Sequence, residues 1–114
     1  MRTVKEKLYR GTRPERGGGD ARLRSQQVLE LLRRIPGWLP TPTGRALVRV
    51  REFTSPFHAE AFATFVAFLT APKSQPVKIT IAEDQVTVLL RPDPRLGSRA
   101  GITRSMLDLA AAIG

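Results

Sequence analysis

The 114-residue sequence has no cysteine, a single histidine (His58) and only 6% aromatic residues. Without cysteine the chain can form neither disulfides nor cysteine-ligated zinc or iron–sulfur sites. We also expect no metal and no cofactor. It also lacks long hydrophobic runs. None approaches the roughly 18 residues that cross a bilayer, and residues 1–20 contain no apolar segment of a secretory signal. We therefore expect no membrane contact and a bacterial, cytoplasmic location.

Acidic residues are scarce as well, with 10 Asp and Glu against 19 Lys and Arg, which gives a net charge of +9. Residues 1–24 carry eight of the bases and three of the acids, so more than half of the excess lies in the first fifth of the chain. Arginine dominates, which favours bidentate contacts to carboxylates or phosphates. The charge predicts an acidic partner without deciding between a protein and a nucleic acid.

A hydrophobic fraction of 41% is enough for one folded domain. Residues 1–20 include the glycine run 17–19, many charges and few sizeable apolar groups. Such a segment buries too little surface to offset the entropy lost on ordering. The sequence therefore predicts a flexible basic tail over 1–22 and a folded domain over 23–114.

Apolar spacing and turn residues predict seven elements in the domain. Ser55 with Pro56, and Thr103, are typical helix starts, whereas strict alternation of apolar and polar residues indicates strands. The expected elements are a helix over 21–35, an extended segment at 38–39, a strand over 46–53, a helix from 56 that ends before Pro72, a hairpin of strands 77–81 and 86–90, and a helix from 103.

This order, α-β-β-α-β-β-α, predicts an α+β fold in which three helices pack on one face of a four-stranded antiparallel sheet. Four of the five phenylalanines fall in the second helix, and we expect its broad apolar face to form the core. Such a small sheet leaves two edges for pairing between subunits, so a homodimer is expected.

Three groups of residues carry a family resemblance over about residues 25–114. Gly37-Trp38 follows the first helix, Phe57, Ala61 and Val66-Ala67 lie in the second, and the last contains the residues Gly101-Ile102-Thr103, Leu109-Ala110 and Ile113. In this order and spacing the chain resembles the pterin-4a-carbinolamine dehydratase family. Enzymes of that family dehydrate a hydroxylated tetrahydropterin by acid–base catalysis with histidines and an acidic residue.

The resemblance also locates the family's catalytic positions, and this chain departs from the family at nearly all of them. The His-His-Pro motif corresponds to Ser74-Gln75-Pro76, and the Thr-His pair corresponds to Pro92-Asp93. Serine and glutamine do not exchange protons near neutral pH, which is the task that histidine performs. We therefore expect no enzymatic activity and a degenerate family site made of Thr70, Ser74, Gln75, Pro76, Asp93 and Met106.

One non-catalytic branch of the family, the Rubisco assembly factor associated with α-carboxysomes, resembles this chain. That resemblance implies a homodimeric chaperone with an acidic partner, the Rubisco large subunit, and a location linked to carboxysomes. The arginines expected to contact the partner are Arg49, Arg51, Arg91, Arg95 and Arg99. Two alternatives stay open: a dehydratase with an altered site, and a basic nucleic-acid-binding module. The second is less favoured because the phenylalanines are expected to be buried rather than free to stack on bases.

Overall fold

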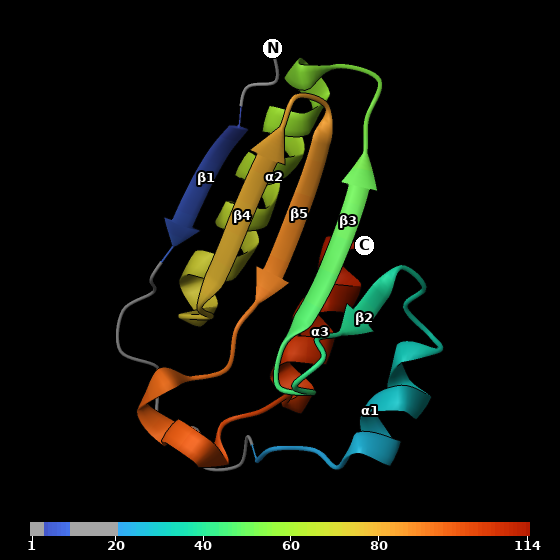
Figure 1. The fold of residues 1–114 in the computed structure, drawn as a ribbon, viewed down its shortest axis with the longest axis vertical. Coiled ribbons are helices and arrows are strands. Elements are labelled where there is room, and N and C mark those ends of the chain that lie inside the picture. The colour runs from blue at the N-terminus through green and yellow to red at the C-terminus, as the bar shows by residue number, and fades with distance from the viewer. Residues whose placement is uncertain (1–3, 10–20) are drawn as a thin grey trace.

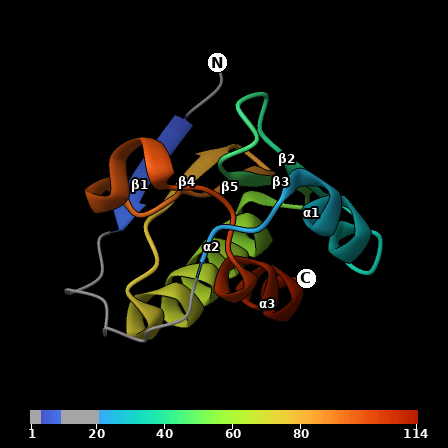
Figure 2. The same cartoon turned by 90° about the horizontal axis from the view of Figure 1, so that it is seen from below.

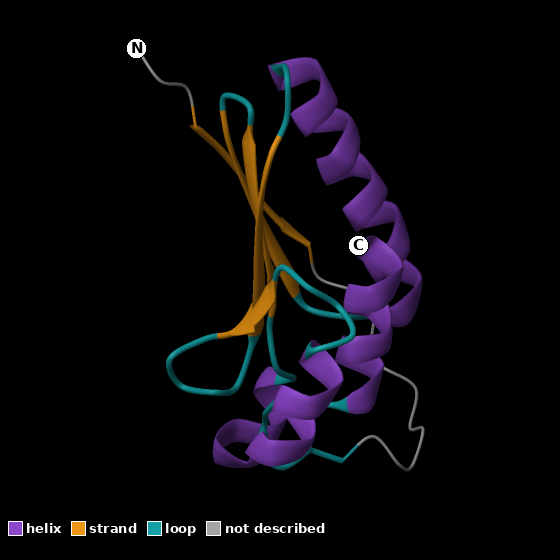
Figure 3. Ribbon diagram, turned by 90° about the vertical axis from the view of Figure 1, so that its right-hand side faces the viewer, coloured by secondary structure: helices purple, strands orange, loops and turns teal. Residues whose placement is uncertain are grey.

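A computed structural model describes residues 4–9 and 21–114 of the chain. One antiparallel sheet lies beneath a layer of helices (Figures 1 and 3). The sheet has the strand order β1-β4-β5-β3-β2. Its strands are β1 (Val4–Tyr9), β2 (Trp38–Pro40), β3 (Leu47–Glu52), β4 (Val77–Ala82) and β5 (Gln85–Leu90). The helices are α1 (Ser25–Leu32), α2 (Pro56–Thr70) and α3 (Arg104–Ile113), with short 3₁₀ segments η1 (Ala71–Lys73) and η2 (Pro94–Arg99).

The predicted α+β class is confirmed, together with the four expected strands and three main helices. Helices α2 and α3 lie against one face of the sheet, and α1 lies beside β2 at one end of the molecule (Figures 1 and 2). Both predicted helix starts are also confirmed. The side chain of Ser55 accepts a hydrogen bond from the backbone N–H of His58, and Thr103 accepts one from Met106.

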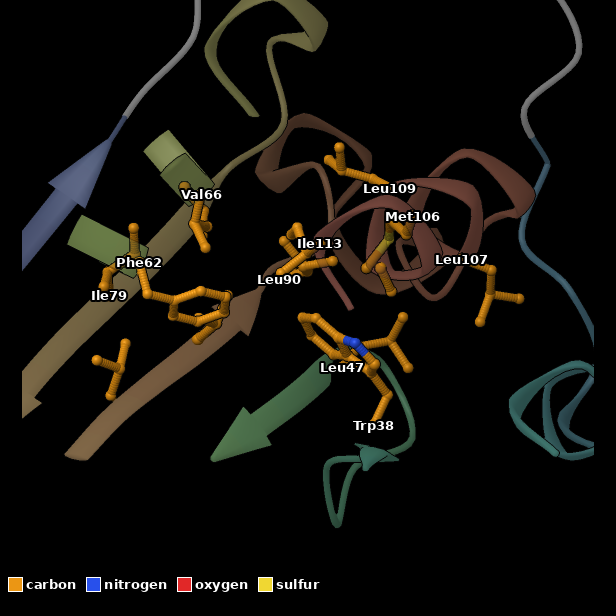
Figure 4. Close-up of a cluster of buried hydrophobic side chains, with 14 of the residues drawn as sticks. Trp38, Leu47, Phe62, Val66, Ile79, Leu90, Met106, Leu107, Leu109 and Ile113 are labelled. Atoms are coloured by element: carbon orange, nitrogen blue, oxygen red, sulfur yellow. The ribbon is translucent and has the colours of Figure 1, made fainter. Parts of the chain in front are cut away.

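The alternation of apolar and polar residues along β4 and β5 determines which face of the sheet the helices cover. Every second residue of β4 and β5 is buried, and their partners across the ladder are buried with them. α2 and α3 pack over these side chains, and α1 adds Val28 and Leu32 to the same core. Figure 4 shows side chains from β2, β3, β5, α2 and α3 meeting in this cluster. One continuous core therefore includes all three helices.

The strand β1 corrects the expected flexible tail. Its residues pair with β4 in register from Val4 opposite Ala82 to Tyr9 opposite Val77. Residues 4–9 carry few apolar groups, but backbone hydrogen bonds along the open edge of β4 stabilise a strand of almost any composition. Arg22, also assigned to the tail, forms a bridge with Thr103. The rest of the predicted tail, residues 1–3 and 10–20, lies outside the described residues.

The phenylalanines of α2 provide a second correction. Phe62 is buried, but Phe57, Phe65 and Phe68 are 76%, 44% and 76% exposed. At 100° per residue, positions 57, 61, 65 and 68 share one side of the helix, opposite the buried positions 59, 63 and 66. α2 is thus apolar on both sides, and only its inner side packs in the core. We call the exposed side, formed by Phe57, Ala61, Phe65 and Phe68, the outer stripe.

Candidate functional site

The positions that the resemblance assigns to the family's catalytic motif, Ser74-Gln75-Pro76, lie at the corner between α2 and β4. Ser74 ends η1 in the left-handed region, with φ 54° and ψ 30°, and its N–H donates to the carbonyl oxygen of Ala71 at 3.0 Å. Few residues other than glycine adopt this conformation. It reverses the chain between the helix and the strand, so Ser74 has a clear structural role at this corner.

Gln75 joins the start of β4 to the end of β5. Its amide Nε2 donates to two backbone carbonyl oxygens, 2.8 Å from that of Pro76 and 2.7 Å from that of Arg91. The backbone N–H of Arg91 returns a bond to the carbonyl oxygen of Pro76 at 2.9 Å. An amide nitrogen carries two hydrogens, and both are used here. Gln75 therefore closes the open end of the hairpin.

Thr70 and Met106 are both buried, in different surroundings. Thr70 is 0% exposed, its hydroxyl donates to the carbonyl oxygen of Ala67 at 3.3 Å, and its own carbonyl oxygen accepts from the N–H of Gln75 at 3.3 Å. Met106 is 3% exposed and belongs to the hydrophobic core. The structure thus brings Thr70, Gln75 and Pro76 together with the end of β5, and it places Met106 among apolar side chains.

Asp93 is the one acidic residue at the site, and its carboxylate is engaged by Arg95. One oxygen accepts from the backbone N–H of Arg95 at 3.0 Å and from its guanidinium Nε at 3.3 Å, while the other lies 3.1 Å from Nη2. Chiefly through the side-chain hydrogen bond from Arg95, the pKa of Asp93 lies below its ordinary value, and the pKa of Arg95 is raised in return. A carboxylate stabilised in this way is a weaker proton acceptor than an unpaired one.

His58 lies at the far end of α2 from this corner. The 12 residue steps from position 58 to position 70 correspond to roughly 18 Å along a helix axis. The ring is exposed, with Nδ1 2.6 Å from the hydroxyl oxygen of Ser55. His58 is therefore a solvated residue beside the N-terminal cap of α2. Within residues 4–9 and 21–114, no three His, Asp or Glu side chains gather in a way that could hold a metal ion.

Two of the arginines expected to contact a partner are held against the chain itself. Nε of Arg49 donates to the carbonyl oxygen of Gly114 at 3.1 Å, and partial burial, then the nearby charge of Arg51, lowers the pKa of Arg49. The guanidinium of Arg51 lies 5.2 Å from the ring centre of Phe53 and 4.9 Å from that of Phe62. Such contacts stabilise an arginine over aromatic rings. We therefore place Arg49 and Arg51 outside the candidate partner surface.

The other three arginines belong to a larger basic surface that the sequence does not reveal. Arg91, Arg95 and Arg99 are exposed on the segment that follows β5. Nε of Arg45 donates to the carbonyl oxygen of Ala100 at 3.0 Å, and its Nη2 bonds to the carbonyl oxygen of Gly97. We call this surface the basic end; its members are Arg22, Arg45, Arg91, Arg95, Arg99 and Arg104.

Arg22 and Arg104 reach the basic end from opposite parts of the sequence. Arg22 is paired with Thr103, the residue before Arg104, and its side chain lies across Gly101. A Cβ atom on Gly101 would stand 2.5 Å from Nε of Arg22, so the glycine leaves room for the arginine. No motif in the sequence links residues 22, 45 and 99, and only the tertiary fold brings them together.

Comparison with known proteins identifies the fold. A solved structure from Brucella melitensis, described as a transcriptional coactivator/pterin dehydratase, matches with a TM-score of 0.70 and 22% identity over 81% of this chain and 94% of that one. The fold is the pterin dehydratase fold. Two proteins from Xanthomonas oryzae pv. oryzae, strains MAFF 311018 and KACC10331 / KXO85, are each named "Putative pterin-4-alpha-carbinolamine dehydratase". Each is 30% identical to this chain over 73 residues, which is 64% of this chain and 62% of the relative.

No protein-family model matches the chain. The chain is similar to these pterin dehydratase-like proteins, and it spans less than two thirds of the length of the sequence relatives that it matches. On this pterin dehydratase-like frame, Gln75 and Asp93, which the resemblance assigns to the family's site, form the structural hydrogen bonds described above.

The Asp93–Arg95 contact predicts a pH-dependent contribution to stability. Because the folded-state pKa is lowered from 3.8, the contact contributes fully above that ordinary value and is lost as the pH falls through the lowered one. Asp93→Asn should therefore lower the free energy of unfolding in urea at pH 7 and have little effect at about pH 2. Asp108→Asn is the control, since its exposed contact to Arg104 at 3.5 Å should contribute little at either pH. An equal loss for Asp93→Asn at both values would contradict the assignment.

Proposed function

We propose that this chain is a non-catalytic, pterin dehydratase-like protein that binds a protein partner and acts as an assembly factor for Rubisco linked to α-carboxysomes. One observation carries the non-catalytic part: the polar groups at the family's catalytic positions are used in structural hydrogen bonds. The amide of Gln75 spans two strands, and the carboxylate of Asp93 is bound on both oxygens by Arg95.

Acid–base dehydration needs a donor and an acceptor whose pKa values lie near the working pH. The side chain of Gln75 has no proton to exchange in that range, and the lowered pKa of Asp93 makes it a weak base. His58, the chain's one histidine, belongs to the other end of α2. The residues present therefore favour binding over proton transfer.

The choice of a protein partner rests on the resemblance to the Rubisco assembly factor and on the charge of the chain. The net charge of +9 and the exposed arginines of the basic end suit an acidic surface such as one on the Rubisco large subunit. The Brucella relative, which is described as both coactivator and dehydratase, supports a binding role for this frame. A bacterial cytoplasmic location with carboxysome association belongs to the same proposal. No helix among the described residues is long and apolar enough to cross a membrane.

A dehydratase with an altered site is the second candidate, and the names of the Xanthomonas relatives favour it. It would require the chain to move a proton through groups other than histidine at the corner between α2 and β4. The carboxylate of Asp93 is the one titratable side chain of the degenerate site, and its lowered pKa argues against that role.

The proposed function predicts a gain in Rubisco assembly. Co-expression of this chain with the large and small subunits of an α-carboxysomal Rubisco in a bacterial host should raise the yield of assembled holoenzyme relative to an empty vector. Native gel electrophoresis and carboxylase activity per cell measure that yield. An unchanged yield and an unchanged distribution of oligomers would contradict the proposal.

The assembly factor acts as a homodimer, with α2 rather than the sheet edges at the interface. β1 covers the edge of β4, and the opposite edge strand, β2, has three residues including Pro40, which has no N–H to donate. The outer stripe of α2, by contrast, exposes three phenylalanines along a single helix. Exposed apolar surface of this kind marks an interaction site.

Charge favours a second copy of this chain as the occupant of the outer stripe. The stripe itself is uncharged, so two copies with net charge +9 can meet there without bringing arginines together. In an antiparallel pair of α2 helices about a two-fold axis, the two outer stripes meet along their length. The opposed helix dipoles are also favourable.

Sedimentation velocity tests this dimer. The wild type should sediment as a dimer at micromolar concentration, and Phe68→Glu should give a folded monomer because it places two like charges in a dry interface. Leu39→Glu is the matched control, because Leu39 is 63% exposed on β2, away from α2, and this variant should remain dimeric. A monomeric wild type, or a dimeric Phe68→Glu variant, would overturn the interface.

A further inference from the structure

Positive and negative charges are separated along the molecule. The turn between β4 and β5 carries Glu83 and Asp84, and the backbone of Asp84 accepts from Phe53, next to Glu52. These acids lie at the upper end of the hairpin in Figure 1, and the basic end lies below the opposite end of β5. An acidic partner is therefore repelled at one end and attracted at the other.

The arginines of the basic end fall into two groups. Arg45, Arg95 and Arg104 are already bound: Arg45 to backbone carbonyl oxygens, Arg95 to Asp93 and Arg104 to Asp108. Arg22, Arg91 and Arg99 are exposed and form no ion pair with the part of the chain that the structure describes, and Arg91 directly follows β5. The first group adds to the positive electrostatic potential of the basic end, whereas the guanidinium groups of the second group can form new contacts.

Arg22 and Arg99 flank one short stretch of chain. Arg99 precedes the buried residues Ala100 to Ile102, and Arg22 crosses Gly101 and pairs with Thr103. The N–H of Leu23 bonds to the carbonyl oxygen of Ile102 at 2.8 Å, which fixes the backbone beside Arg22. Arg22 and Arg99 thus lie on either side of one stretch of paired, buried backbone.

From this arrangement we infer that the basic end binds an extended, carboxylate-rich segment of a partner protein, with Arg22 and Arg99 as its main contacts. The inference rests on the proposed function, which requires a protein partner, and it assigns the surface and its chemistry. Guanidinium groups pair with carboxylates through two parallel hydrogen bonds, which are stronger than neutral ones.

A protein segment fits this surface better than a nucleic acid. Single-stranded nucleic acids bind through base stacking on aromatic rings as well as through phosphate contacts. Residues 21–24, residue 45 and residues 91–104 include no aromatic side chain. The exposed phenylalanines lie on the outer stripe of α2, which the dimer covers. The basic end therefore presents guanidinium groups to a ligand and no aromatic ring on which a base could stack.

Fluorescence anisotropy with a labelled deca-glutamate peptide tests the assignment, with a labelled 15-nucleotide single-stranded DNA as the competing class. The wild type should bind the peptide more tightly than the DNA at 100 mM salt. Arg22→Gln/Arg99→Gln should weaken peptide binding about tenfold or more, since each lost charged hydrogen bond alone can give a change of that size. Arg33→Gln/Arg34→Gln, at the end of α1, removes the same charge elsewhere and should stay within about twofold.

The variant Gly101→Ala tests the position of the Arg22 side chain without changing the net charge. The added Cβ displaces the side chain of Arg22 while every charge is kept, so peptide affinity should fall about threefold with an unchanged circular dichroism spectrum. Tighter binding to DNA than to the peptide, no peptide binding, or equal losses in the two double arginine variants would each overturn the inference.

The Rubisco co-expression assay distinguishes this inference from the proposed function. If the wild type raises the yield of holoenzyme and Arg22→Gln/Arg99→Gln raises it equally, the basic end is not the partner surface and the proposed function stands. If the wild type has no effect on the yield, the proposed function fails, and peptide binding alone decides whether the basic end recognises carboxylates.

Discussion

The burial of one face of the β4–β5 hairpin beneath α2 determines where the other parts of the molecule lie. Alternate residues of both strands are almost fully buried, and the inner side of α2 packs on them. This packing sets the corner at Ser74, directs the acidic turn to one end of the sheet, and leads the chain after β5 to the other end. The degenerate site and the basic end are both consequences of that layer.

At the corner, the side chains that the resemblance assigns to catalytic positions form structural hydrogen bonds. An amide in place of an imidazole adds no proton chemistry, but its two hydrogens can each reach a different carbonyl oxygen, as those of Gln75 do. Asp93 similarly begins η2 and accepts from Arg95. Met106 lies in the core, where an aspartate would have to be buried and paired. Each change is consistent with a frame that is kept for its shape.

Local signals in the sequence predict much of the fold. The caps at Ser55 and Thr103 and the alternation along the hairpin depend on neighbours within a few residues, so they can be read directly. β1 could not be predicted, because its stability comes from backbone pairing with a strand some 70 residues away. The exposed side of α2 could not be predicted for another reason. A helix that is apolar on all sides does not indicate which side faces the core.

The site was predictable in part. Family positions could be located from the resemblance, but the hydrogen bonds of Gln75 and the stacking of Arg51 depend on tertiary neighbours. The basic end required the fold itself, because its arginines come from four separate segments.

Turnover of 4a-hydroxytetrahydropterin tests most directly whether this protein lacks proton chemistry and acts by binding. The purified protein at 10–100 µM, followed by absorbance at neutral pH beside an active dehydratase, should give a rate equal to that of buffer alone. A rate above buffer that scales with protein concentration and falls in Asp93→Asn would contradict the account and restore an altered dehydratase site.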